Sequence, residues 1–278
     1  MKPRAVRPTP IGRIPVIAVG PVIEAGRWPA KAVVGEAVPI EATVFREWHD
    51  AVAATAVLLR PNGTVHSTAR MVDIAHGLDR HQGWVVPDAT GRWSLRVEGW
   101  SDPYGTWSHD AGIKVGAGVD VELMLTEGAL LLDRAANRPR QDAAHATALR
   151  NAVAALRDTS RPPQARLAAG LSAPVRAALD ATPVREYVSS SATYPLQVDR
   201  ERALYGSWYE LFPRSEGATY NKRTKKWTSG TLRTAAERLP GIAEMGFDVV
   251  YLTPIHPIGT TNRKGRNNSL TCMPTDPG

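Results

Sequence analysis

The chain of 278 residues has a single cysteine, Cys272, so no disulfide bond can form within it. Such cysteine usage is typical of proteins in a reducing compartment. The sequence also has no run that approaches the roughly 20 apolar residues of a membrane span. Pro15, Gly20 and Pro21 interrupt the apolar stretch that a secretory signal would need after the basic start. We therefore expect a cytoplasmic protein with no membrane partner.

Acidic residues are fewer than basic ones, 27 against 34, which gives a net charge of +7. Clustered cations would indicate a nucleic-acid partner, because they bind phosphate chains through counterion release. Here the cations are mostly arginine, are spread along the chain and accompany abundant alanine, as in proteins from high-GC bacterial genomes. We therefore expect no nucleic-acid partner. Three local clusters remain: the N-terminal tail, residues 222–226 and residues 263–266.

Aromatic residues make up only 6% of the chain, yet eight of them are tryptophan and three are phenylalanine. The hydrophobic fraction of 43% and the charged fraction of 22% are ordinary for a globular protein. A chain of this length and composition can bury a sizeable core in roughly two domains.

The first part of the chain predicts a disordered tail and then a β-sandwich. Residues 1–12 are rich in proline and arginine, as disordered termini often are. From residue 13 to 119, short apolar runs alternate with turn-forming stretches such as Arg60-Pro61-Asn62-Gly63 and Asp102-Pro103-Tyr104-Gly105. The runs are residues 14–19, 38–45, 54–59 and 93–97. This spacing predicts an antiparallel, immunoglobulin-like sandwich.

Four tryptophans in this region have two interpretations. Trp84, Trp93, Trp100 and Trp107 either form a sugar-stacking surface or belong to the core or an interface. We favour the second, because a large aromatic side chain is most often buried.

Residues 120–197 predict a small helical subdomain, because alanine, leucine, glutamate and arginine dominate them. Leu149, Val153 and Leu156 fall on one helical stripe. Ser160-Arg161-Pro162-Pro163 is a break, and Pro174 and Pro183 each stand where a new helix could begin. The serines at 189–191 are expected to end the subdomain.

Residues 198–278 predict the opening of a parallel α/β fold. Residues 205–212 suit a buried strand, and 247–252 are a near-continuous apolar run of the kind found in parallel sheets. Between them we expect a helix with Thr231 as its N-cap, kinked or split at Pro240 and ended by Gly246. Strand, helix and strand in this order form a βαβ unit.

The loop after the second of these strands is the candidate binding segment. In α/β barrels the active site lies at the carboxyl ends of the strands. The loop supplies three amides, Asn262, Asn267 and Asn268, and three cations, Arg263, Lys264 and Arg266. Such donors suit sugar hydroxyls or a phosphate. The alternative is a solvated loop with no ligand.

Three stretches of this last region carry a resemblance to known enzymes. The run Gly246-Phe247-Asp248-Val249-Val250-Tyr251-Leu252-Thr253-Pro254 resembles the second-strand signature of the α-amylase superfamily, with a glycine before the strand and a proline closing it. The loop from Ile255-His256-Pro257-Ile258-Gly259 to Asn268 and the run Trp208-Tyr209-Glu210-Leu211-Phe212-Pro213-Arg214-Ser215 are similar to those of α-1,4-glucan:maltose-1-phosphate maltosyltransferases. The predicted sandwich followed by a helical insert is also the N-terminal layout of that family.

The resemblance implies a retaining transferase that moves maltosyl from maltose 1-phosphate onto an α-1,4-glucan, with no organic cofactor and no metal. It implies homodimers to whose contact the N-terminal domains contribute. It also implies Lys264 as a sugar contact, with Asn262, Arg263 and Asn268 as further substrate-binding residues. His256 either shapes the pocket or, as we favour, is a packed structural histidine.

The catalytic residues are expected to be absent from this chain. Retaining transfer needs two carboxyl groups roughly 5–5.5 Å apart, and the resemblance implies that they lie on later barrel strands. Glu210 and Asp248 match neither position, and we interpret both as structural. A barrel takes about 250 residues, so residues 198–278 are only its start, with two strands. We expect a fragment that has no transferase activity alone.

Two other functions stay open. The chain is alternatively a non-catalytic dimerisation or glucan-binding module, with a vestigial barrel stub. It is otherwise part of a branching or debranching enzyme of the α-amylase superfamily, since these also carry β-sandwich domains before the barrel. The composition of the loop at residues 262–268 argues against this last alternative.

Overall fold

The computed structural model of the chain describes residues 12–75, 77–139, 141–256, 259 and 261–273. The chain divides into two compact units, Met1–Arg200 and Glu201–Gly278. The predicted tail at residues 1–12 lies outside the described residues, apart from Gly12. Among the helices that are described, none is long and apolar enough to cross a membrane.

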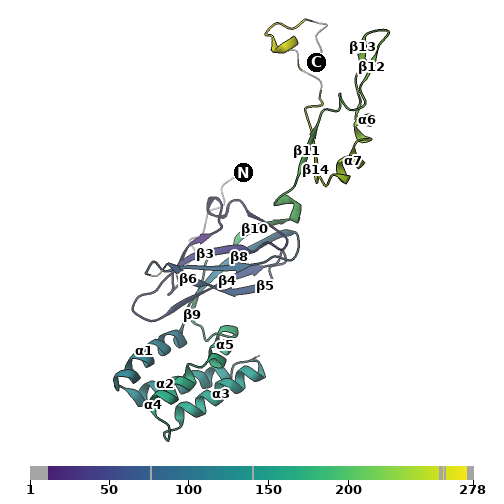
Figure 1. The fold of residues 1–278 in the computed structure, drawn as a ribbon. Coiled ribbons are helices and arrows are strands. Elements are labelled where there is room, and N and C mark those ends of the chain that lie inside the picture. Colours follow the sequence, from purple (N-terminus) through teal and green to yellow (C-terminus); the bar gives the residue numbers. More distant parts are fainter. Residues whose placement is uncertain (1–11, 76, 140, 257–258, 260, 274–278) are drawn as a thin grey trace. The chain divides into compact units, whose positions relative to one another are not determined.

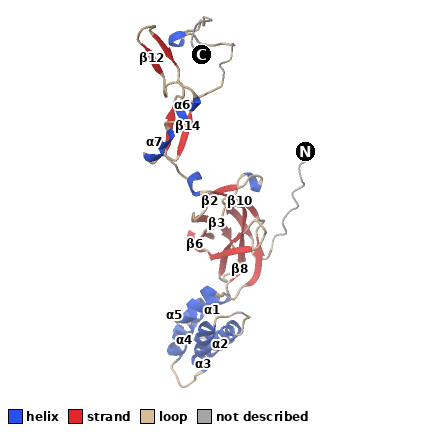
Figure 2. Ribbon diagram, turned by 90° about the vertical axis from the view of Figure 1, so that its right-hand side faces the viewer, coloured by secondary structure: helices blue, strands red, loops and turns tan. Residues whose placement is uncertain are grey.

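The first unit contains two β-sheets around a shared core (Figures 1 and 2). One sheet has the strand order β1-β3-β7-β6, and the other has the order β2-β10-β8-β4-β5, with β9 also paired to β8. The strands are β1 (Val16–Gly20), β2 (Ala30–Val33), β3 (Val38–Val44), β4 (Val52–Leu59), β5 (Val65–Arg70), β6 (Val72–Ala75), β7 (Arg80–Val85), β8 (Gly91–Ser101), β9 (Glu186–Ser190) and β10 (Tyr194–Asp199). A 3₁₀ turn, η1 (Glu24–Gly26), precedes β2.

The sandwich core follows from the alternation of apolar residues. In β3, Val38, Ile40, Ala42 and Val44 are buried, and the residues between them are not. This period of two places one face of a strand on the core. The core residues of β3 meet leucines from the other sheet, including Leu58 of β4, in one cluster. The β-rich character predicted for this region is confirmed.

Two features of the sandwich differ from the prediction. β10 pairs with β2 in parallel, so the sandwich is not wholly antiparallel. In addition, β9 and the first four residues of β10 fall within residues 120–197, which the sequence assigned to a helical subdomain. The serines at 189–191 belong to β9 and its end, and the alternation of Leu196 and Val198, both fully buried, returns the chain to the sheet.

The predicted β character of residues 102–119 is wrong. These residues form α1 (Pro103–Ala117), whose N-cap is Asp102. The Asp102 Oδ1 atom accepts a hydrogen bond from the Gly105 backbone N–H at 3.0 Å. An aspartate followed by proline is a helix start as well as a turn, and here the helix forms because it buries Trp107, Ala111 and Val115.

Five helices form a layer at one end of the sandwich (Figure 1). They are α1, α2 (Val121–Ala136), α3 (Ala143–Arg157), α4 (Pro163–Gly170) and α5 (Ala173–Ala181). Leu149, Val153 and Leu156 are all buried, as the helical stripe predicts. Proline stands in the first turn of α4 and of α5, but Pro183 begins no helix, because the chain enters β9 three residues later.

The second unit has a parallel strand pair with two short helices against it. Its elements are η2 (Glu201–Ala203), β11 (Trp208–Leu211), β12 (Thr219–Asn221), β13 (Lys226–Thr228), α6 (Leu232–Ala236), α7 (Leu239–Glu244), β14 (Val249–Leu252) and η3 (Arg266–Asn268). β11 and β14 are parallel, with Trp208 opposite Val249. The pairing predicted for these segments is confirmed, and so is the split of the helix at Pro240.

One face of the strand pair is covered. Leu211 packs with Ala235 of α6 and Ile242 of α7, and Tyr209 and Val250 lie against this cluster. Thr231 caps α6 as predicted: its side chain accepts a hydrogen bond from Thr234 N–H at 3.2 Å. The strand, helix and strand therefore fold as the βαβ pattern indicates.

Candidate functional site

The carboxyl ends of β11 and β14 border a hollow of ≈ 460 Å³. Its walls come from the segment after β11, the segment after β14 and the start of α6. The lining residues are Phe212, Pro213, Arg214, Gly230, Thr231, Leu232, Thr253, Pro254, Ile255 and His256. A hollow at this edge of a parallel sheet is where α/β enzymes bind their ligands.

The wall beside α6 is held by a tight loop contact. The Gly230 N–H donates to the Arg214 carbonyl oxygen at 2.8 Å, and the Thr234 hydroxyl donates to the Glu216 carbonyl oxygen at 2.7 Å. A Cβ atom on residue 230 would lie 1.9 Å from the Glu216 carbonyl oxygen, so only glycine fits there. The segment after β11 is thereby fixed against the start of α6.

The lining of the hollow combines apolar and polar groups. Phe212, Leu232 and Ile255 are exposed apolar side chains, and Arg214, Thr253 and His256 supply polar ones. Apolar faces with a few polar donors are what a sugar ring needs. His256 is exposed and borders the hollow, so the favoured prediction of a packed structural histidine is wrong.

The four predicted substrate-binding residues lie in the loop that follows β14. Lys264, Asn262 and Asn268 are exposed and Arg263 is half-buried. The loop is folded on itself at η3, where the Gly265 N–H donates to the Ser269 carbonyl oxygen at 2.9 Å. None of the four is among the residues that line the hollow. Pro257, Ile258 and Thr260, which belong to the resemblance, lie outside the described residues.

Asp248 has a structural role at the opposite end of the strands. Its Oδ2 atom accepts a hydrogen bond from the Ser207 backbone N–H at 3.1 Å, and Arg202 lies 3.3 Å from its other oxygen. The hydrogen bond from Ser207 and the charge of Arg202 hold the pKa of Asp248 below its usual value. Glu210 is exposed on β11. Neither carboxyl group lines the hollow.

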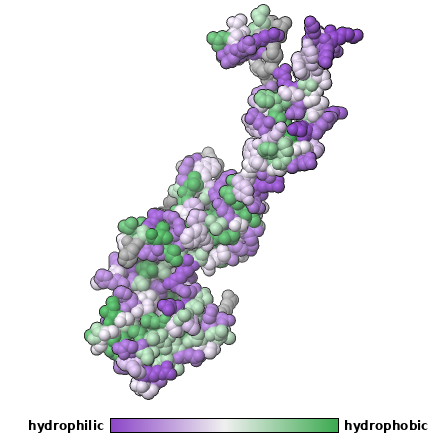
Figure 3. Space-filling view, in the orientation of Figure 1, coloured by the Kyte–Doolittle hydropathy of each residue, from purple (hydrophilic) through white to green (hydrophobic). Residues whose placement is uncertain are grey.

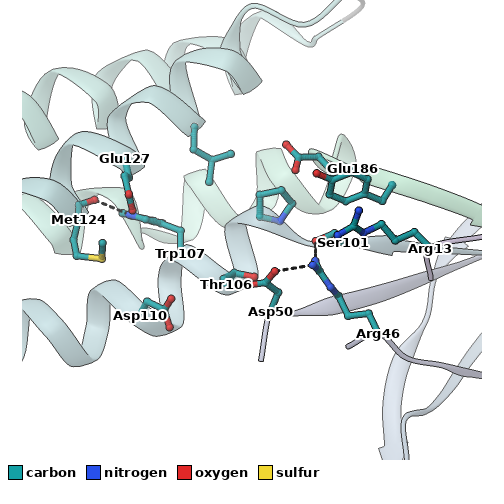
Figure 4. A pocket seen from close by; sticks show the side chains of 13 residues that line it. Arg13, Arg46, Asp50, Ser101, Thr106, Trp107, Asp110, Met124, Glu127 and Glu186 are labelled. Carbon is teal, nitrogen blue, oxygen red and sulfur yellow. Dashed lines mark hydrogen bonds and ion pairs between the residues drawn. The ribbon is translucent and has the colours of Figure 1, made fainter. Parts of the chain in front are cut away.

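A second hollow, of ≈ 410 Å³, lies in the first unit where the helices meet the sandwich (Figure 4). Several of its polar groups bond to one another or to the backbone. Arg46 donates to the Ser101 hydroxyl at 2.6 Å and pairs with Asp50 at 2.9 Å. Trp107 Nε1 donates to the Met124 carbonyl oxygen at 2.7 Å. We interpret this hollow as a structural seam, and no sequence motif indicated it.

The tryptophans divide between core and surface. Trp93, Trp100 and Trp107 are 2%, 0% and 6% exposed, whereas Trp84 is 50% exposed. Three of the four therefore belong to the core and do not form a sugar-stacking surface. Within the part of the chain that the structure describes, no group of three or more histidine, cysteine, aspartate or glutamate side chains is placed to hold a metal ion.

Comparison with known proteins gives the family to which these features belong. Residues 12–200 match the family model described as α-1,4-glucan:maltose-1-phosphate maltosyltransferase, domain N/S. The chain therefore belongs to the α-1,4-glucan:maltose-1-phosphate maltosyltransferase family.

Individual relatives carry the same name. α-1,4-Glucan:maltose-1-phosphate maltosyltransferase 1 of Streptomyces coelicolor is 54% identical over 276 residues, which are 99% of this chain and 40% of the relative. The enzyme of Arcanobacterium haemolyticum is 50% identical over 268 residues, which are 96% of this chain and 39% of the relative. The enzyme of Mycobacterium tuberculosis is 42% identical over an alignment 295 residues long, which covers 96% of this chain and 41% of the relative. The chain thus spans about two fifths of the length of these relatives.

Proposed function

We propose that the chain is the N-terminal portion of a retaining maltosyltransferase, which moves maltosyl from maltose 1-phosphate onto an α-1,4-glucan. The observation that carries the proposal is the parallel pair of β11 and β14, whose carboxyl ends border a hollow with apolar and polar walls. The relatives that match nearly the whole chain are named for this reaction.

In this proposal, β11 and β14 are the first two strands of an α/β barrel. The chain brings one wall of the donor pocket, and Lys264, Asn262, Arg263 and Asn268 bind substrate from the loop after β14. Their side chains offer N–H donors and positive charge, which suit the sugar hydroxyls and the phosphate of the donor. Inorganic phosphate leaves as its bond to the sugar breaks.

The transfer reaction requires carboxyl groups, and none of the described residues brings one to the hollow. A retaining transfer uses one carboxylate as nucleophile and a second carboxyl group as acid and then base. No carboxyl group is among the residues that line the hollow, and Asp248 lies at the far end of the strands. The nucleophile and the acid/base therefore come from the later part of the protein, and the chain alone is inactive.

We also place the assembled enzyme in the cytoplasm, as a homodimer to whose contact the first unit contributes, with no organic cofactor. The single cysteine supports the cytoplasm, and the resemblance supports the dimer. A sedimentation measurement on the purified chain tests the dimer: a monomer at micromolar concentration contradicts it.

An alternative is a non-catalytic module that binds glucan or forms dimers through the first unit. One observation favours it, namely that the first unit has a complete core of its own and an exposed Trp84 on β7. Retention of the chain on a glycogen column, lost in Trp84→Ala, together with failure of the activity test below, would select this module.

Phosphate release tests the transferase proposal. The purified chain is mixed with a second polypeptide, which carries the part of the Streptomyces coelicolor relative beyond its matched region. Maltose 1-phosphate and glycogen are supplied, and inorganic phosphate is measured. We expect the mixture to release phosphate and each polypeptide alone to release none.

A pair of variants checks that the second unit is responsible. Leu211→Asp places a charge in the buried cluster of the second unit and is expected to abolish turnover. Leu78→Asp makes the same change at an exposed turn of the first unit and is expected to leave turnover unchanged. Robust phosphate release by the chain alone contradicts the proposal.

A further inference from the structure

The hairpin formed by β12 and β13 carries an exposed aromatic pair. Tyr220 and Trp227 are directly opposite each other across the two strands, with ring centroids 5.1 Å apart. Their side chains remain 45% and 69% exposed. The two ring planes are tilted by 46° to each other, and each exposed ring is a face on which the apolar side of a sugar ring can stack.

The turn of the same hairpin concentrates positive charge. Lys222, Arg223, Lys225 and Lys226 are all exposed. Among the described residues none of these four cations makes an ion pair, and the only acidic residue between positions 214 and 228 is Glu216. Neighbouring like charges repel one another, so an anion bound at the turn relieves this repulsion. Figure 3 shows strongly hydrophilic surface at the hairpin.

The cations stand on a fixed turn. The Asn221 Oδ1 atom accepts hydrogen bonds from the backbone N–H groups of Arg223 and Thr224, each at 3.0 Å. This asparagine turn mimics a backbone turn and sets the direction of the chain. Lys222, Arg223 and Lys225 lie in this turn, and Lys226 is the first residue of β13, one position before Trp227.

The hairpin is continuous with the candidate site. It belongs to the segment that connects β11 to α6, so it lies at the carboxyl ends of the strands (Figure 1). A hollow of ≈ 490 Å³ at its base is lined by Trp227 and Arg214, among others. Arg214 also lines the hollow at the strand ends. Arg214 is thus shared by the hollow at the hairpin and the hollow at the strand ends.

We propose that the β12–β13 hairpin is a capture site for the glycosyl phosphate donor, which it binds before the donor enters the hollow at the strand ends. The cations of the turn hold the phosphate, and the ring of Trp227 stacks on the sugar. This inference rests on the proposed function, because it takes the donor to be an α-glycosyl phosphate. A cluster of cations beside a site also raises the local concentration of an anionic substrate.

Binding of maltose 1-phosphate to the purified chain, measured by isothermal titration calorimetry, tests the inference. The variant Lys222→Gln/Arg223→Gln/Lys225→Gln/Lys226→Gln is expected to weaken binding by at least about tenfold. Its matched control removes four exposed arginines from the first unit, Arg92→Gln/Arg150→Gln/Arg157→Gln/Arg176→Gln, and is expected to bind as the parent does. Raising the salt concentration should weaken binding to the parent chain and not to the hairpin variant.

The aromatic contribution is tested separately with Trp227→Ala and Trp227→Phe. The alanine variant is expected to lose affinity for maltose 1-phosphate and keep its affinity for inorganic phosphate, and the phenylalanine variant is expected to retain most of both. Thermal unfolding checks that each variant is folded. If the alanine variant does not fold, the affinities of Trp227→Phe for the two ligands still test the aromatic contact.

Two results would overturn the inference. One is equal affinity of the hairpin variant and its control for maltose 1-phosphate. The other is a single-stranded oligonucleotide that binds the hairpin more tightly than maltose 1-phosphate does, which would indicate a nucleic-acid site instead. Phosphate release by the complemented enzyme tests only the proposed function. If the mixture releases phosphate and the hairpin variant still binds maltose 1-phosphate as its control does, the proposed function stands and this inference is wrong.

Discussion

Trp107 shows how one side chain organises the helical layer of the first unit. Its ring packs so closely on α2 and α4 that a Cβ atom on Gly128 would lie 2.1 Å from it, and one on Gly170 would lie 2.8 Å from it. Its Nε1 atom donates to the Met124 carbonyl oxygen, which satisfies the buried polar group. The sequence predicts that Trp107 is buried, but it does not indicate that two glycines make room for the ring.

The variant Gly128→Ala tests this packing. The new methyl group has no space beside Trp107, and overpacking a core costs about 1–3 kcal/mol. We therefore expect the free energy of unfolding of the first unit to fall by that amount, measured by urea denaturation. Gly112→Ala on α1 is the control: no atom lies within 4 Å of its new Cβ, so it should stabilise the helix by about 0.5–1 kcal/mol. Equal effects of the two variants contradict the account.

Glu98 of β8 pairs with Arg96 of the same strand and with Arg185, the residue before β9. It accepts hydrogen bonds from Arg96 at 2.7 Å and from Arg185 at 2.9 Å, and its side chain is 11% exposed. Burial raises the pKa of Glu98, but the hydrogen bonds and charges of the two arginines outweigh it, so the pKa lies below the usual value of 4.5. The ionised form therefore stabilises the folded state.

Glu98→Gln is expected to lower the free energy of unfolding at pH 7 by about 2–3 kcal/mol, since it leaves two half-buried guanidinium groups without their carboxylate. A carboxyl group with a lowered folded-state pKa contributes its stability above the unfolded pKa and loses it as the pH falls. The difference in the free energy of unfolding between variant and parent should therefore become smaller below about pH 4.5. Chemical denaturation at a series of pH values measures this difference. The control Glu47→Gln, at an exposed position, should leave the free energy of unfolding nearly unchanged.

The candidate site was predictable on one side only. The glycine, apolar strand and proline at 246–254 predict the wall that follows β14, and Ile255 and His256 border the hollow. The other wall depends on the contact of Gly230 with the Glu216 carbonyl oxygen, which brings Arg214 to the hollow. Residues this far apart meet only through folding of the hairpin segment, and no local pattern in the sequence indicates their contact.

At the scale of elements, local signals identified most strands and helices, and long-range pairing decided the rest. Thr231 and Pro240 predict the start and the split of the helical segment because both act on neighbouring residues. β9 and β10 are held by strands almost 100 residues away or more: Ser190 pairs with Glu98, and Leu196 pairs with Ala30. Because residues 120–180 have a helical composition, the sequence did not predict that the chain returns to the sheet after them.

Asp102 lies between the end of β8 and the start of α1, and substituting it tests how α1 begins. It caps the helix through the Gly105 N–H, and its Oδ2 atom pairs with Arg70 at 2.7 Å. Asp102→Ala should reduce the free energy of unfolding by about 1–2 kcal/mol. Asp102→Asn keeps an acceptor for the cap and should fall between parent and alanine variant; chemical denaturation measures both. An alanine variant as stable as the parent would mean that the helix needs no cap.

For the whole molecule, the two units differ in how much core each one has. The first unit has two large clusters, one in the sandwich and one in the helical layer. Among the described residues of the second unit, the buried hydrophobic cluster has only Leu211, Ala235 and Ile242. Trp208 and Tyr251 lie together on the uncovered face of its strand pair and remain exposed. An isolated two-stranded sheet is marginally stable in water.

The second unit is therefore expected to open more readily than the first. In thermal unfolding, the fluorescence and circular dichroism of the chain should report an early transition from the second unit and a later one from the first. Leu211→Asp should remove the early transition and leave the later one in place, whereas Gly128→Ala should lower only the later one. A single transition shifted by both variants would contradict this division.

Hydrogen–deuterium exchange of the β11 and β14 amides tests the central claim most directly. The claim is that residues 208–211 and 249–252 are the first two strands of a barrel that the later part of the enzyme completes. Adding the complementing polypeptide should slow exchange at these amides by at least about 100-fold and leave the core of the sandwich unchanged. Exchange that stays fast at both strands while the mixture releases phosphate would show that the barrel forms without them.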